Sequence, residues 1–227
     1  MSMPASVLTP PLRDGDHLTR EEFMRRWEAM PDLKRAELID GIVHMASPLS
    51  KIHGNFHTLM GFWLGSYLTA TRGCSAPTDA TWLMSEDSAP QPDLALCINP
   101  ERGGQSRDEG KYAAGAPELI VEISHTTSAR DAGIKLRLYE RCGVREYVIV
   151  RPEKKQVIWR ELVDGKYREI EPSADGILRS RVFPGLWLDQ TALWNRDYAG
   201  LAAVVQQGMA TAEHAEFLRK LESAKPR

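Results

Sequence analysis

The sequence has few of the features that mark disulfide-stabilised, zinc-binding or membrane-spanning proteins. Its only cysteines among 227 residues are Cys74, Cys97 and Cys142, and no two of them have the CxxC spacing of a zinc or redox site. No apolar run approaches the roughly 18 residues that span a bilayer, and the first residues lack the charged and apolar regions of a signal peptide. We therefore expect a cytoplasmic protein with no membrane partner.

An excess of charge of one sign is also missing. The 29 basic residues are balanced by 31 acidic ones, and the net charge of -2 argues against a strongly basic nucleic-acid-binding protein. However, residues 124–160 contain nine basic and four acidic side chains, so this stretch carries +5 and the remainder carries -7. Such a stretch is most often a solvated surface, but it also suits contact with phosphates.

The length and composition suit one domain with a sizeable core, because 42% of the residues are hydrophobic and 26% are charged. We expect a Pro-rich tail over residues 1–17, a main domain over residues 18–195 and a helical extension over residues 196–227. The extension is Ala-rich, with a break expected at Gly208. It can pack on the core or on a second subunit, so a homodimer is one expectation.

Local patterns predict an α/β fold. Thr19 followed by Glu22 is a capping box that begins a helix, and Asp-Gly pairs between apolar runs predict two antiparallel hairpins. Strands alternate with helices, which predicts a mixed sheet flanked by helices, with hairpins attached. The expected elements are helices over residues 20–30 and 52–73, hairpins over residues 37–45 and 157–170, and strands over residues 78–84, 93–98, 118–123 and 146–150, the first of these strands pairing with the second.

Two carboxylates stand where the predicted strands are buried. Asp93 follows Pro92 and opens an apolar run, so it lies at the beginning of a strand. Glu122 interrupts a second apolar run, and the period of two places it on the same face as Ile120. An unpaired buried carboxylate costs several kcal/mol, on the order of the penalty for an isolated ion, so these positions need cations or donors.

A lysine lies on the apolar face of the helix that follows. The residues of that face are Asp131, Ile134, Lys135, Leu138, Tyr139 and Cys142. Taken alone, Lys135 would most simply pack its stem and extend its ammonium to water. Together with two carboxylates on neighbouring strands, it predicts oxygen ligands for a hard divalent cation and a positive group that positions or activates water. The small number of carboxylates suits Mg²⁺ or Mn²⁺ better than zinc.

Five short segments of this stretch occur in an order found in a known nuclease superfamily. They are Gln91-Pro92-Asp93, Val121-Glu122-Ile123-Ser124, Ser128-Ala129-Arg130-Asp131, Lys135-Leu136-Arg137-Leu138-Tyr139 and Gly143-Val144-Arg145-Glu146-Tyr147. With them, the sequence resembles the PD-(D/E)XK nucleases, specifically the Uma-type restriction endonuclease family, over about residues 18–195. The superfamily usually has its lysine two residues after the glutamate, where this chain has Ser124. Lys135 matches the position on the next helix to which this family has moved it.

The resemblance implies a metal-dependent endonuclease that acts on nucleic acid, most simply DNA. It implies that Asp93 and Glu122 hold Mg²⁺ or Mn²⁺, and that Lys135 and Glu37 complete the catalytic set. An exposed acid at a strand end is nearly as good an interpretation of Glu37. Substrate-binding positions implied by the resemblance are His53, Ser124 and Arg130.

Two other interpretations of the chain remain open. One is a catalytically inactive module that keeps the nuclease fold for DNA binding or assembly, because a fold does not guarantee a function. The other is a hydrolase of a small phosphate ester, which would need a closed apolar pocket that the sequence does not show. The retention of Asp93, Glu122 and Lys135 together favours the endonuclease.

Overall fold

A six-stranded mixed sheet forms the centre of the molecule. The computed structural model describes residues 9–124 and 129–224, with side chains in helix α3 described from Gly133 onward. The strand order is β11-β10-β9-β8-β5-β3; the β8–β9 pair is parallel and the other pairs are antiparallel. The strands are β3 (Cys74–Ser75), β5 (Leu94–Ile98), β8 (Leu119–Ile123), β9 (Glu146–Arg151), β10 (Gln156–Val163) and β11 (Lys166–Glu169).

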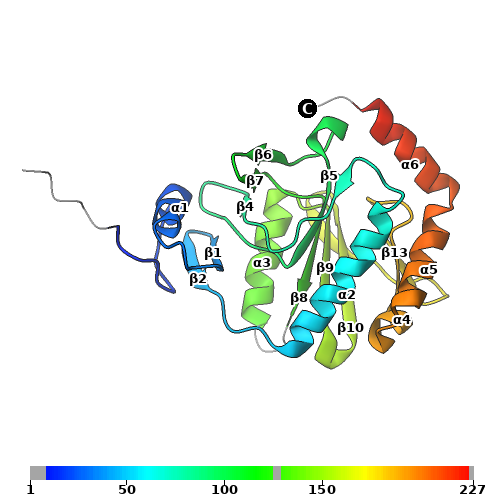
Figure 1. Ribbon diagram of the computed structural model, residues 1–227, viewed down its shortest axis with the longest axis horizontal. Helices are drawn as coiled ribbons and strands as arrows, with labels where there is room; N and C mark the ends of the chain where they lie inside the picture. Colours follow the sequence, from blue (N-terminus) through cyan, green and yellow to red (C-terminus); the bar gives the residue numbers. More distant parts are fainter. Residues whose placement is uncertain (1–8, 125–128, 225–227) are drawn as a thin grey trace, which may run out of the picture.

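Helices cover both faces of this sheet. Helix α3 (Ala129–Cys142) connects the parallel strands β8 and β9, since a parallel pair needs a crossover. Helix α2 (Lys51–Leu68) lies on the opposite face, with Phe56, Met60 and Trp63 in the main hydrophobic cluster. Figure 1 shows α3 on one side of the strands and α2 on the other, with α4, α5 and α6 beyond it. The predicted mixed sheet flanked by helices is confirmed.

The two predicted hairpins are present and share one turn chemistry. Strands β1 (Ala36–Ile39) and β2 (Ile42–Met45) flank Asp40 and Gly41, which have φ angles of 51° and 76°. A two-residue turn with both central φ angles positive matches the right-handed twist of the strands, and glycine and aspartate tolerate that conformation. Strands β10 and β11 are joined in the same way at Asp164 and Gly165.

An amino-terminal unit lies beside the central sheet. Helix α1 (Arg20–Glu28) begins after Thr19, whose side chain accepts a hydrogen bond from Glu22 N as the capping box predicts. The helix and the β1–β2 hairpin share a hydrophobic cluster that is separate from the main one. Its buried residues are Leu12, Phe23, Ala36, Leu38, Val43, Leu83, Ala89 and Ala114.

The prediction of a strand over residues 78–84 is mostly wrong. Only β4 (Trp82–Leu83) forms, and it pairs with β7 (Tyr112–Ala114), which also pairs with β6 (Arg107–Glu109). Asp79 has a φ of 52°, a left-handed conformation that interrupts an extended strand. The segment reaches β5 only through a single bridge between Thr78 and Leu94.

The carboxy-terminal helices pack against the core of the same chain. Strands β12 (Ile177–Arg179) and β13 (Trp187–Asp189) pair before α4 (Gln190–Asn195), and α5 (Tyr198–Met209) and α6 (Ala212–Ser223) follow. Leu201 and Val205 of α5 are buried in the main cluster beside α2. Gly208 lies against Gly185, where a Cβ atom would collide with the Gly185 carbonyl oxygen, and the helix break comes after it, at residues 210–211. Within the described ranges, no helix is long and apolar enough to cross a membrane.

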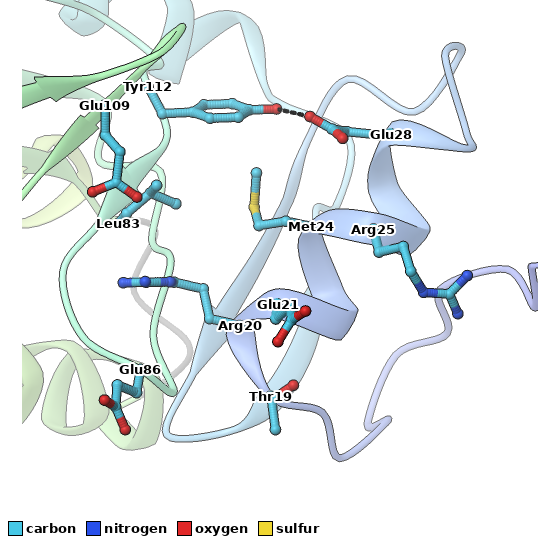
Figure 2. Close-up of a pocket in the computed structure, with 10 residues that line it drawn as sticks. All are labelled: Thr19, Arg20, Glu21, Met24, Arg25, Glu28, Leu83, Glu86, Glu109 and Tyr112. Carbon is cyan, nitrogen blue, oxygen red and sulfur yellow. Dashed lines mark hydrogen bonds between the residues drawn. The ribbon is translucent and has the colours of Figure 1, made fainter.

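A hollow of about 690 Å³ separates α1 from β4 and β7. Figure 2 shows Met24 and Arg20 of α1 facing it, with the Tyr112 hydroxyl 3.5 Å from Glu28 Oε1 on its far side. The Arg20 guanidinium donates a hydrogen bond to the backbone carbonyl oxygen of Ser85. The acidic and basic side chains around this hollow do not converge on one point, so it does not resemble a catalytic centre.

Candidate active site

A second, smaller cleft contains most of the sequence-predicted site residues. Its volume is about 440 Å³, and it lies where the β1–β2 hairpin, the start of α2, the start of β5 and the end of β8 meet α3. The polar and charged residues that line it are Arg35, Glu37, His44, Ser47, Ser50, His53, Gln91, Asp93, Glu122 and Lys135. The cleft is partly open to solvent.

Asp93 directly precedes β5 and is almost completely buried. One of its oxygens, Oδ2, accepts a hydrogen bond of 2.8 Å from the backbone N–H of Ile123 on the neighbouring strand β8. The other oxygen, Oδ1, lies 3.3 Å from His53 Nε2 and 3.3 Å from Arg35 Nη2. Burial raises the pKa of Asp93, but the contacts with His53 and Ile123 outweigh it and hold that pKa below its usual value. The carboxylate is therefore ionised at neutral pH.

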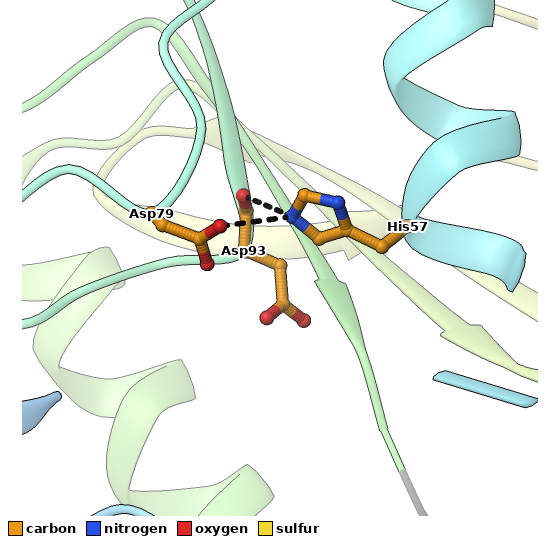
Figure 3. A group of neighbouring side chains, drawn as sticks. All are labelled: His57, Asp79 and Asp93. Carbon is orange, nitrogen blue, oxygen red and sulfur yellow. Dashed lines mark hydrogen bonds and ion pairs between the residues drawn. The ribbon is translucent and has the colours of Figure 1, made fainter. Parts of the chain in front are cut away.

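A histidine and a second aspartate lie beside the backbone carbonyl of Asp93, as Figure 3 shows. His57 Nε2 is 3.0 Å from the Asp93 carbonyl oxygen and 3.5 Å from Asp79 Oδ2. Ligand atoms of His57, Asp79 and Asp93 lie within 4.8 Å of one another, close enough to hold one cation. Of these three, the sequence predicted only Asp93 as a ligand.

Glu122 projects from β8 toward α3. Its Oε1 accepts a hydrogen bond of 2.9 Å from Lys135 Nζ and one of 2.8 Å from the Tyr139 hydroxyl. Burial raises the pKa of Glu122 to about 7, against the lowering effect of Lys135 and with a further rise from the negative charge of Asp93. The negative charges of Glu122 and Asp93 therefore repel each other across the cleft.

Lys135 does not extend to water. Its Nζ is 2.9 Å from Glu122 Oε1 and 3.0 Å from Glu37 Oε1, so it bridges a strand of the central sheet and a strand of the hairpin. Burial lowers the pKa of Lys135, but the two carboxylates outweigh it and hold that pKa above its usual value. The ammonium stays charged, so it can orient water or stabilise negative charge but does not serve as a base.

Glu37 and Gln91 complete the floor of the cleft. The backbone N–H of Gln91 donates to Glu37 Oε1 over 2.7 Å, which fixes the carboxylate in place. The side-chain amide of Gln91 is buried and donates to Thr81 Oγ1 over 3.1 Å. Among the described residues, no donor reaches its Oε1. A buried amide oxygen without a donor lies on the wall of an acidic cleft and needs a partner there.

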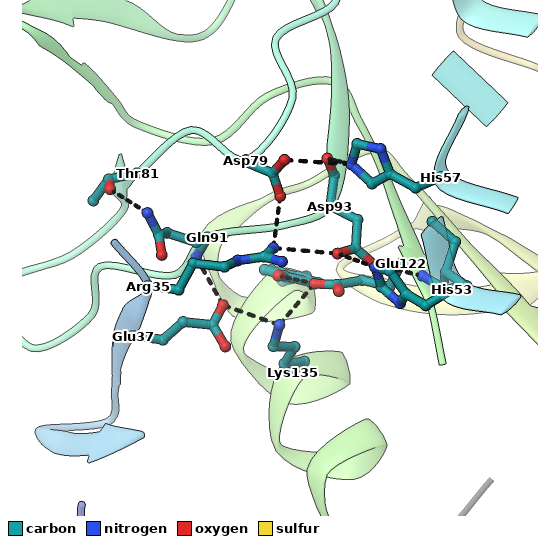
Figure 4. Close-up of polar contacts among 12 residues, drawn as sticks. Arg35, Glu37, His53, His57, Asp79, Thr81, Gln91, Asp93, Glu122 and Lys135 are labelled. Carbon is teal, nitrogen blue, oxygen red and sulfur yellow. Dashed lines mark hydrogen bonds and ion pairs between the residues drawn. The ribbon is translucent and has the colours of Figure 1, made fainter. Parts of the chain in front are cut away.

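Figure 4 shows the polar network that these side chains form. The structure brings together five of the seven sequence-predicted site residues: Glu37, His53, Asp93, Glu122 and Lys135. Ser124 follows β8 outside the cleft lining and donates its backbone N–H to Val150. The side chain of Arg130 lies outside the described residues. The predicted roles of all seven residues stay predictions.

Sequence reasoning did not select Arg35, Asp79 or Gln91 for the site. Arg35 had only a weak signal, its spacing of two residues before Glu37, because alternate residues of an extended segment share a face. Gln91 precedes the Pro-Asp pair and was used only as part of the motif. Asp79 had no signal, since it comes from an irregular segment that approaches Asp93 only in the folded chain.

Comparisons with known proteins identify a family and a shared fold. A family model named Uma2, described as "Putative restriction endonuclease", matches residues 20–191. A crystal structure of "a putative nuclease belonging to DUF820" from Anabaena variabilis has a TM-score of 0.59 at 17% identity, covering 78% of this chain and 98% of its own. At that identity the likeness shows a shared fold. No curated protein matches the chain significantly.

Proposed function

The chain belongs to the Uma2 family of restriction-endonuclease-like proteins, and from that premise we propose that it is a metal-dependent endonuclease that hydrolyses phosphodiester bonds in DNA. The observation that supports this proposal most is the position of Lys135. Its ammonium bridges Glu122 and Glu37 in an open cleft that also contains Asp93. A lysine that only packed its stem on this helix would have extended its ammonium to solvent instead.

The residues of the cleft suit a hard divalent cation. Asp93 and Glu122 offer carboxylate oxygens, and the buried Oε1 of Gln91 is an amide oxygen that no donor in the described part of the chain reaches. Carboxylate and amide oxygens are the donors that Mg²⁺ and Mn²⁺ prefer, and Mg²⁺ needs only one or two carboxylates from the protein. When bound, such an ion neutralises charge on the phosphodiester and polarises it toward attack.

The neighbouring side chains supply positioning and electrostatics. Lys135 stays charged and can orient the attacking water or stabilise the charge that develops on the phosphate. Glu37 holds Lys135 from the opposite side to Glu122 and can contact the ion through a water. His53, which holds Asp93, also faces the cleft where a substrate phosphate would lie.

DNA is the substrate that the family description favours, because restriction by definition concerns DNA. The basic excess of residues 124–160 gives modest support, since phosphate contacts depend on lysine and arginine. The open cleft suits a polymer better than the closed apolar pocket of an enzyme for small phosphate esters.

The test is metal binding and plasmid nicking by the same preparation. Calorimetric titration with Mn²⁺ should show one site that Asp93→Asn weakens by at least about tenfold, since a shared carboxylate ligand is lost. Nicking of supercoiled plasmid should require Mg²⁺ or Mn²⁺ and stop with EDTA. Equal Mn²⁺ affinity in Asp93→Asn and the parent would refute the metal site. Metal binding without nicking would favour the inactive nuclease-fold module.

A further inference from the structure

Arg35 occupies the position at Asp93 that a cation would take. Its Nη2 lies 3.3 Å from Asp93 Oδ1 and 2.6 Å from Asp79 Oδ1, so one guanidinium contacts both aspartates. Figure 4 shows this guanidinium between the two carboxylates, on the side of Asp93 that faces Gln91 and Glu37. Arg35 directly precedes β1 of the hairpin, whereas Asp93 directly precedes β5 of the central sheet.

The contacts of Asp93 leave little room for another cation while Arg35 is present. Oδ2 is held by the Ile123 N–H, and Oδ1 is shared between His53 and Arg35. A positive charge at this distance also repels a second cation, and it does so strongly because the carboxylate is nearly excluded from water. A metal ion that uses Asp93 must therefore displace Arg35 or share Oδ1 with it.

Asp79 provides an alternative position for the guanidinium. Its contact with Arg35 is shorter than the Asp93 contact, and its side chain is 46% exposed, so this pair can persist when Asp93 is engaged elsewhere. His57 lies 3.5 Å from the other oxygen of Asp79 and keeps that carboxylate beside Asp93.

From this arrangement we propose that Arg35 is a built-in counterion of Asp93 that competes with the divalent cation, and that Asp79 draws the guanidinium away when the cation binds. Arg35 is thus a positioning residue that keeps Asp93 neutralised in the metal-free protein. The inference rests on the proposed function, because it assumes that Asp93 is a metal ligand. It differs from the alternative in which His57, Asp79 and Asp93 themselves form a cation site.

The experiment is calorimetric titration of the full-length protein with MnCl₂, without nucleic acid. Arg35→Gln should bind Mn²⁺ roughly five- to tenfold more tightly than the parent, since the cation then no longer has to break an ion pair between Arg35 and Asp93. Arg35→Lys keeps the charge and serves as the matched control, with an affinity close to that of the parent. Asp79→Asn should bind Mn²⁺ more weakly, by about threefold, because Arg35 then has only Asp93 as a partner.

The double variant Arg35→Gln/Asp79→Asn separates the two roles of Asp79. If Asp79 acts through Arg35, its substitution should have much less effect when Arg35 is already absent. An equal effect in both backgrounds would make Asp79 a ligand and overturn the proposal. Thermal melts of every variant identify any that fail to fold. If Arg35→Gln and the double variant do not fold, Asp79→Asn alone decides, and a Mn²⁺ affinity equal to that of the parent would overturn the proposal.

The outcome also distinguishes this inference from the function it rests on. If Asp93→Asn loses Mn²⁺ while Arg35→Gln binds no tighter than the parent, only the counterion inference fails. A purely structural Arg35 predicts the opposite sign, because its loss would disorder Asp93 and weaken binding. If Asp93→Asn binds Mn²⁺ as the parent does, the proposed function fails and the counterion inference fails with it.

Discussion

Replacement of Lys135 by methionine tests the centre of the proposed mechanism. Methionine keeps an unbranched apolar stem of similar length and removes the ammonium that lies 2.9 Å from Glu122 and 3.0 Å from Glu37. If that ammonium orients water or stabilises charge in the transition state, the nicking rate should fall about a hundred- to a thousandfold.

The structure also predicts an effect on stability. Breaking a fully buried ion pair costs about 3–5 kcal/mol, but the Lys135, Glu122 and Glu37 side chains are 17%, 12% and 19% exposed, so about 2 kcal/mol is more realistic here. For a chain of this length, about 2 kcal/mol corresponds to a fall of about 4–8 °C in the thermal midpoint.

This loss of stability should depend on pH. The pKa of Glu122 is already about 7, and removal of the neighbouring ammonium raises it further. Below that pH the carboxyl is protonated and no longer needs a cation, so the difference between the variant and the parent should be small at pH 5 and larger at pH 8.

The assay measures the nicking rate and the thermal midpoint on one preparation at both pH values. Lys166→Met is the matched control, because Lys166 forms an ion pair of 2.6 Å with Glu140 but its side chain is 79% exposed. It should nick at the parental rate and melt within about 2 °C of the parent, since exposed pairs contribute little. Lys135→Met with a parental nicking rate would mean that the lysine only packs in the wall of the cleft.

Two further predictions concern the fold. Burial raises the pKa of Glu146 to about 7, so the contribution of Glu146 to stability is complete below about pH 4.5 and is lost as pH rises through 7. The free energy of unfolding of Glu146→Gln, measured in urea, should therefore rise relative to that of the parent by up to about 3 kcal/mol over that range. A difference that stays constant with pH would refute this. Gly208→Ala should lower the thermal midpoint, because the new Cβ would meet the Gly185 carbonyl. Gly65→Ala on α2 has open space around the new Cβ and should raise the thermal midpoint by about 1–4 °C. Equal effects at the two glycines would contradict the close packing of α5.

Elements with strong local signals could be predicted from the sequence. The capping box at Thr19 and the Asp-Gly turns of both hairpins act through contacts within a few residues, so the chain alone encodes them. The strand predicted over residues 78–84 is mostly wrong, because the strand that forms, β4, depends on pairing with β7, about 30 residues later, and on the left-handed conformation of Asp79. Pairing with a distant partner leaves no local pattern.

The site residues also divide into those that the sequence could indicate and those that it could not. Glu122 and Lys135 could be found because a charged group inside an apolar run has a cost that must be compensated, and each compensates the other. The signal for Arg35 is a period of two that ends at Glu37, too short to distinguish from chance. Asp79 and the orphaned oxygen of Gln91 depend on how loops meet in space.

The expectation of a homodimer loses its main support. It rested on an Ala-rich extension that could pack on the core or on a second subunit. In the structure this extension packs on the core of its own chain, through buried Leu201, Val205, Phe217 and Leu221. Removal of residues 197–227 would therefore expose the core rather than test association. Dimerisation stays a prediction, to be tested by analytical ultracentrifugation of the intact chain.

The separate hydrophobic cluster of the amino-terminal unit has a consequence for protein engineering. Arg35 and Glu37 reach the cleft from a hairpin whose Leu38 and Val43 pack with α1, while Ile39 of the same strand packs with residues of the central sheet and α3. A redesign that keeps Ile39 and changes only Arg35 or Glu37 can therefore alter the charge of one wall of the cleft without repacking the strands that hold Asp93 and Glu122. A graft of this chemistry onto another scaffold must carry over both parts of the backbone, because the sheet provides Asp93 and Glu122 and α3 provides Lys135, whereas Arg35 and Glu37 come from the hairpin segment.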